Sequence, residues 1–140
     1  MGMCLRILFV LSFTLSFVAA VGSSIQPVVE IEEVVYKYES ANNGAGPMWC
    51  AGSTSLFRFE DNVYATGLET LSDEKPLNNC RWVLFEREES GWKRRYVDRG
   101  RTREPVPLVG FHYGRVYVSG NPTLGEGAEP GGGPTHPDIF

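Results

Sequence analysis

Apolar and aromatic residues recur along this chain in short runs, separated by polar stretches rich in glycine, proline and asparagine. Runs of β-branched and aromatic residues without helix caps or a 3.6-residue period are typical of strands. The pattern predicts an isolated first strand within Val28–Tyr38. Three hairpins follow, whose strands are expected at 53–59 and 63–68, at 81–87 and 92–97, and at 106–111 and 115–119.

The first hairpin returns later in the chain. Leu56–Ala65 corresponds to Leu108–Val118, at an offset of 52 between the leucines and one residue more at the other end. A repeat of about this length made of strands and turns predicts a small all-β module. Within it the strand at 53–59 is apolar and the strand at 92–97 is charged, as the inner and outer strands of a β-propeller blade would be. We therefore expect an all-β fold: a β-propeller fragment of about one and a half four-stranded antiparallel blades.

The first twenty residues have the pattern of a signal peptide. Arg6 precedes an apolar run from Ile7 to Val18, and small residues lead to a cleavage position after Ala20, with Gly22 nearly as good a site. The run is shorter than the ~20 apolar residues of a membrane anchor, and no basic stop follows it. We expect a secreted or periplasmic protein that has no membrane contact after cleavage.

Residues 21–140 are then expected to form the incomplete propeller, with a first strand at 27–40, one blade at 47–98 and a partial blade at 104–140. By composition 120–137 could be a flexible linker, but the repeat places there the loop between the second and third strands of a blade, which we favour. Loss of Arg6 reduces the 13 basic residues to 12 against 17 acids, a net charge of −5. This charge disfavours a nucleic-acid-binding surface.

Three segments carry a family resemblance: Asn-Gly-Ala-Gly-Pro-Met-Trp-Cys at 43–50, Pro-Leu-Asn-Asn-Cys-Arg-Trp at 76–82 and Arg-Glu-Pro at 103–105. Together they resemble the amino-terminal region of secreted bacterial propeller proteins of the sialidase-like, BNR-repeat group, over roughly 34–122. The resemblance implies a fold more than a reaction. Sialidases carry a turn of the form S-x-D-x-G-x-T-W; here 89–92 keeps the Gly and Trp and lacks the Asp and Thr. The arginine triad, Tyr/Glu pair and acid/base Asp loop of sialidases have no counterpart.

The candidate binding residues fall on one face. Loops of an antiparallel meander alternate between the strand ends, so the loop leading into a blade's first strand lies beside the loop joining its second and third. Trp49 could stack on a sugar, Arg81 could bind a carboxylate or phosphate through its fork of donors, and Glu104 completes the set. The blander alternatives are packing for Trp49 and an ion pair for Arg81. We expect a glycan or other extracellular ligand as the partner; the oligomeric state stays open.

A catalytic function stays open. Glu69 and Arg81 are the weak candidates for a propeller glycoside hydrolase or lyase, because paired carboxylates cleave glycosidic bonds. A non-catalytic structural or interaction protein is the third possibility. The basic residues between 93 and 103 are interleaved with Asp98 and followed by Glu104, and half of them belong to the strand expected at the edge, so they are interpreted as a solvated face.

Cys50 and Cys80 could form a disulfide in an exported protein. An intervening strand, however, separates their own strands by about 9.6 Å, more than the ~7 Å that such a bond tolerates, so both outcomes stay open. His112 and His136 are expected on opposite faces, which excludes a shared metal. We expect no cofactor and find no phosphate-binding loop or dinucleotide motif.

Overall fold

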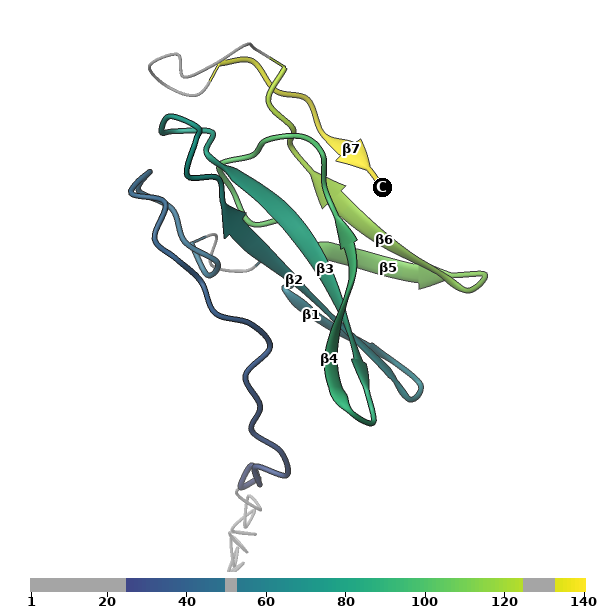
Figure 1. Ribbon diagram of the computed structural model, residues 1–140. Coiled ribbons are helices and arrows are strands. Elements are labelled where there is room, and N and C mark those ends of the chain that lie inside the picture. Colours follow the sequence, from purple (N-terminus) through teal and green to yellow (C-terminus); the bar gives the residue numbers. More distant parts are fainter. Residues whose placement is uncertain (1–24, 50–52, 125–132) are drawn as a thin grey trace, which may run out of the picture. The chain divides into compact units, whose positions relative to one another are not determined.

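The computed structural model describes residues 25–49, 53–124 and 133–140 (Figure 1). The chain divides into two compact units, 1–32 and 33–140. The predicted signal peptide lies outside the described residues, and the described part of the first unit, 25–32, is exposed and forms no strand or helix. None of the described residues belongs to a helix of the length and apolarity that a membrane crossing requires.

The first sheet has four antiparallel strands in sequence order and confirms two of the predicted hairpins. Its strands are β1 (Leu56–Phe59), β2 (Asn62–Thr70), β3 (Cys80–Glu88) and β4 (Gly91–Val97). The tight turns need backbone conformations with positive φ, which Glu60 (54°) and Gly91 (113°) adopt. Local alternation and short turns were therefore enough to predict this sheet.

The second sheet has three strands in the order β5 (Leu108–His112), β6 (Arg115–Gly120) and β7 (Asp138–Ile139). The β5–β6 turn uses Tyr113 and Gly114, both with positive φ, as two-residue hairpin turns require. The register shifts between Leu108 and Gly110, so Val109 is the extra residue of the longer repeat, accommodated as a β-bulge. The segment after β6 joins it to β7, as the repeat predicted.

Side chains divide the first sheet into two faces, because directly paired residues of antiparallel strands point the same way. We call the face of Ala65 and Phe85 the first face, and that of Leu68 and Trp82 the second face. The second sheet packs on the second face, where a buried cluster joins both sheets: Ala41, Leu68, Cys80, Trp82, Val106, Leu108 and Val118. Figure 1 shows the two sheets lying side by side.

The two sheets stack head to tail. The repeat matches Ala65 with Val118, and Phe85 pairs with Ala65 as Phe140 pairs with Val118. Hence the face of the second sheet that packs against the first sheet is the one that corresponds, in the repeat, to the first face of the first sheet. Two hydrogen bonds fix the approach: the Thr66 hydroxyl donates to the Val106 carbonyl at 2.6 Å, and the Leu108 N–H donates to the carbonyl of residue 54 at 2.8 Å.

The prediction of an isolated first strand within Val28–Tyr38, in a segment with bounds 27–40, is wrong: the described residues before β1 form no strand. Residues 33–41, which we call the strap, lie on the first face instead. Tyr36 stacks on Phe85, with ring centroids 5.1 Å apart, and its hydroxyl accepts a hydrogen bond from the Leu68 N–H. Side chains of the strap hold it on the face of the sheet. Its β-branched and aromatic residues therefore pack against the sheet without the backbone hydrogen bonds of a paired strand.

The protein is therefore all-β, with antiparallel sheets of four and three strands.

Candidate functional site

Three connecting segments are tied together at one end of the sheets, as the alternation of loops predicted. The Asn43 amide donates to the Leu77 carbonyl at 3.1 Å, and the Asn79 amide donates to the Ala41 carbonyl at 2.7 Å. Cys80 and Thr102 exchange two backbone hydrogen bonds of 3.1 and 2.7 Å. Backbone and buried amides thus hold the loops in fixed positions and build a rigid rim.

A pocket of about 210 Å³ opens in this rim. We call it the loop-end pocket; its lining residues are polar or small: Asn78, Thr102, Arg103, Glu104, Asn121, Gly133 and Thr135. Asn78 and Thr102 are buried, at 4% and 2% exposure. Deeply set polar groups with fixed positions are what orients a ligand in a binding site.

Arg103 is the central group of the loop-end pocket. Its guanidinium carbon lies 5.2 Å from the centroid of the Trp49 ring, within the range of a cation–π contact. Its Nε is buried and has no hydrogen-bond partner among the described residues. An unsatisfied buried donor costs ~1–3 kcal/mol, so the described residues leave one donor of this guanidinium without an acceptor.

The backbone around Arg103 leaves room for its guanidinium. Gly44 has a φ of +75°, and a Cβ built there would lie 3.4 Å from Nη2 of Arg103. Two features therefore favour glycine at position 44: its backbone conformation and the close approach of the Arg103 side chain.

Glu104 gives the pocket an acceptor beside this donor. The Glu104 N–H donates to the Thr102 hydroxyl oxygen at 3.2 Å, a short turn that fixes the backbone on which the carboxylate stands. The side chains of Arg103 and Glu104 cancel in charge, and Asn78 and Asn121 offer amide donors and acceptors. The pocket therefore suits groups that both donate and accept hydrogen bonds, such as hydroxyls.

The structure separates Arg81 and Glu69 from this pocket. They are paired across β2 and β3 on the first face, with Arg81 Nε 2.6 Å from a Glu69 oxygen and Arg94 Nη2 3.3 Å from the other. Glu69 and Arg94 line a second cleft, of about 320 Å³, beside the strap. Burial alone would raise the pKa of Glu69, but the hydrogen bond and charge of Arg81, with the charge of Arg94, hold it below its ordinary value. Glu69 is therefore ionised at neutral pH.

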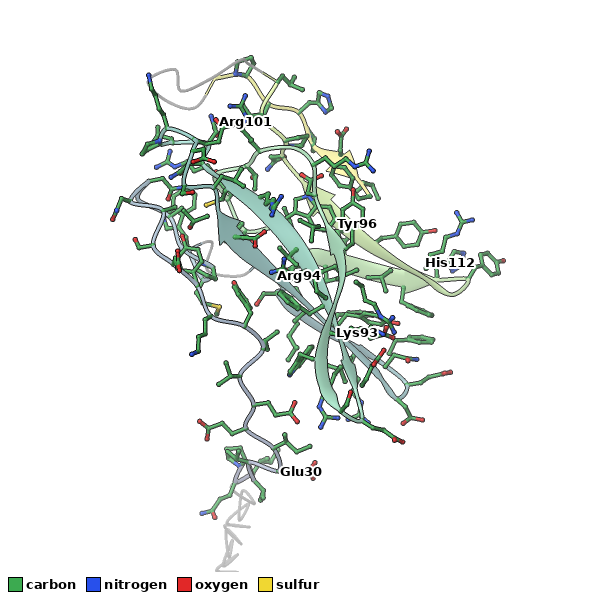
Figure 2. All side chains as sticks on the ribbon, in the orientation of Figure 1. Glu30, Lys93, Arg94, Tyr96, Arg101 and His112 are labelled. Carbon is green, nitrogen blue, oxygen red and sulfur yellow. The ribbon has the colours of Figure 1, made fainter. Side chains whose placement is uncertain are left out.

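Of the predicted binding residues, the structure thus brings Trp49 and Glu104 together through Arg103. Sequence reasoning missed Arg103, which it assigned to a solvated basic face. Lys93, Arg94 and Arg95 do form ion pairs with glutamates, and Figure 2 shows Lys93 and Arg94 on β4. The signal for Arg103 was its place in the loop leading into the second repeat, next to Glu104.

The cysteine and histidine predictions have different outcomes. Cys80 is buried and forms no disulfide with another described residue; burial raises the pKa of its thiol, against hydrogen bonds from Tyr38, Asn43 and Thr70. Cys50 lies outside the described residues, so the bond between them stays a prediction. His112 is the last residue of β5, next to the β5–β6 turn (Figure 2), whereas His136 contacts Asp138 at 2.9 Å. No group of three metal-ligating side chains occurs within 25–49, 53–124 and 133–140.

No family model, no curated protein and no solved structure matches this chain. The resemblance to sialidase-like propellers stays a prediction.

Proposed function

We propose that this chain is part of an exported β-propeller protein that binds a glycan through the loop-end pocket. The observation that carries the proposal is Arg103, a guanidinium held against Trp49 with a buried N–H that no described residue accepts. The head-to-tail stacking of two sheets built from one repeat supports the propeller architecture, in which successive blades present equivalent faces to one another.

The chemistry of the pocket favours a neutral saccharide. Adjacent hydroxyls of a sugar accept from Arg103 and donate to Glu104, and Asn78 and Asn121 can serve either purpose. A carboxylate ligand would be attracted by Arg103 and repelled by Glu104. The volume of about 210 Å³ is below the ~300–1,000 Å³ of sites for drug-sized ligands, so we expect one sugar unit in the pocket and its neighbours over the exposed part of Trp49.

A glycan array probed with the labelled mature chain tests this proposal. For the best array ligand, Arg103→Met should weaken binding about tenfold or more, because hydrogen bonds to charged groups contribute ~1.5–3 kcal/mol. Arg99→Met is the matched control, since Arg99 is an exposed arginine of the same connecting segment and does not line the pocket. Unchanged binding by Arg103→Met would remove the assignment, and an array without binding would favour a structural or interaction protein.

A glycoside hydrolase or lyase is less well supported. The acid of such a pair needs a raised pKa to hold its proton at neutral pH. Glu69 has a lowered pKa and is bound by two arginines, an arrangement that stabilises the sheet.

A further inference from the structure

The second cleft, which we call the strap cleft, lies between the strap and the first face of the first sheet. Its volume of about 320 Å³ falls within the ~300–1,000 Å³ of small-molecule sites. Two hydrogen bonds attach the strap to β2 here: the Leu68 N–H donates to the Tyr36 hydroxyl, and the Thr70 hydroxyl donates to the Glu39 carbonyl. The cleft therefore extends from the strap across β3 to Arg94 on β4 (Figure 2).

The deepest part of the strap cleft is apolar. Val83 and Phe85 of β3 line it and are 1% and 5% exposed. The ring of Tyr36 also lines it and stacks on Phe85. Burying a hydroxyl without a hydrogen-bond partner is unfavourable, so this floor suits a ligand with an apolar body and not a sugar.

Charged residues surround the apolar floor. Lys37 and Glu39 come from the strap, and Glu69 and Arg94 come from the sheet. Lys37 is exposed and forms no ion pair with another described residue. Glu69 is bound by Arg81 as well, so three cationic groups accompany two carboxylates. One added negative charge would balance them.

Arg94 is the group best able to bind that added charge. Arg81 Nε lies 2.6 Å from one Glu69 oxygen, whereas both terminal nitrogens of Arg94 share the other oxygen, at 3.3 and 3.4 Å. Strong charge-assisted hydrogen bonds measure ~2.7–2.9 Å, and a guanidinium binds a carboxylate best through two parallel bonds. Arg94 can therefore turn its donors to another carboxylate, while Arg81 keeps Glu69 paired.

We propose that the strap cleft binds a small carboxylic acid with an apolar body. Its carboxylate binds Arg94 and the Lys37 ammonium, and its apolar body lies on Phe85 and Tyr36. Glu39, which also lines the cleft, repels ligands of higher negative charge such as phosphate esters. No residue of the strap cleft lines the loop-end pocket, so this site does not depend on the glycan proposal.

The probe is 3-phenylpropionate, titrated into the ¹⁵N-labelled mature chain and followed by NMR. The Arg94 Nε–H and Val83 amide resonances should shift together and saturate with a Kd of about 1 mM, as a ligand of this size allows. Two matched probes separate charge from apolar body: 3-phenylpropanamide has the shape without the charge, and propionate has the charge without the ring. Each should bind about tenfold or more weakly.

Substitutions locate the binding of 3-phenylpropionate. Arg94→Gln should weaken it about tenfold, and Lys37→Gln, which removes an exposed charge, about threefold. Arg95→Gln and Lys93→Gln are the matched controls and should leave it unchanged, because both residues bind glutamates of β3 and neither lines the cleft.

Three results would each overturn the proposal: shifts that do not saturate by about 10 mM, equal binding of the amide, or an equal loss in Arg95→Gln and Arg94→Gln. Binding or its absence on the glycan array bears on none of these measurements.

Discussion

At the scale of single residues, the absence of a side chain at Gly67 makes room for the ring of Tyr36 on the first face of the sheet; we call this contact the Gly67 socket. A Cβ built at Gly67 would lie 2.6 Å from two ring carbons of Tyr36. Packing of the strap therefore requires a residue without a side chain at position 67, which is 31 positions after Tyr36 in the sequence. No short-range pattern reveals such a pair, because the two residues meet only when the strap lies on the first face.

Gly67→Ala should destabilise the fold by about 1–3 kcal/mol, the usual cost of inserting a methyl group into a packed site. Gly46→Ala is the matched control, since a Cβ at Gly46 meets nothing within 4 Å. Urea unfolding followed by tryptophan fluorescence measures both. If the loss arises from the clash with the ring, Tyr36→Ala combined with Gly67→Ala should cost less than the sum of the single changes. Additive losses would contradict the socket.

The candidate site was predicted in part, for a reason that lies in individual residues. Trp49 and Glu104 could be placed at one end because loop positions follow from strand order. Arg103 was assigned to a solvated face because sequence gives its charge and not its contacts. The stacking on Trp49 and the buried, unpartnered Nε depend on loops that meet only in three dimensions.

At the scale of elements, the hairpins were predictable and the strap was not. The alternation within 56–70 and 80–97 indicates strands, and short turns decide which strands pair. For residues 33–41 the same composition suits both pairing at a sheet edge and packing on a sheet face. The long-range contacts of Glu33 and Tyr36 decide between them.

The anchoring of the strap should depend on pH. Glu33 accepts hydrogen bonds from Arg87 at 2.8 and 2.7 Å and from the Trp92 indole at 3.0 Å. The hydrogen bond from Arg87 lowers the pKa of Glu33, whose ordinary value is 4.5. Since the folded pKa is lower than the unfolded one, this anchor is complete above pH 4.5 and is lost as pH falls through the folded pKa.

The Trp92 indole N–H resonance in NMR should therefore titrate with a midpoint below 4.5, because protonation weakens the acceptor of this N–H. Glu33→Gln should abolish the titration, and the Trp82 indole, in the other cluster, serves as the internal reference. A midpoint at or above 4.5 would show that Arg87 does not hold the carboxylate in solution.

At the scale of the whole second unit, 33–140, one aromatic contact recurs in the stack. Trp82 lies 5.3 Å from Phe140, and Tyr36 lies 5.1 Å from Phe85, where Phe85 and Phe140 occupy corresponding positions of the two sheets. Tyr36 of the strap therefore contacts Phe85 of the first sheet in the same way as Trp82 of the first sheet contacts Phe140 of the second. Each sheet therefore receives its covering ring from the segment before it.

This arrangement predicts different roles for two tryptophans of the first sheet. Trp82, at 3% exposure, packs in the cluster that joins the sheets, so Trp82→Ala should cost about 3–5 kcal/mol. It should also uncouple the sheets, so that amides of β6 exchange faster than those of β2. Trp92 packs against the separate cluster of the first face, and Trp92→Ala should leave β6 exchange tied to that of β2. If Trp82→Ala accelerates β2 and β6 equally, the sheets unfold as one cooperative unit without depending on this ring.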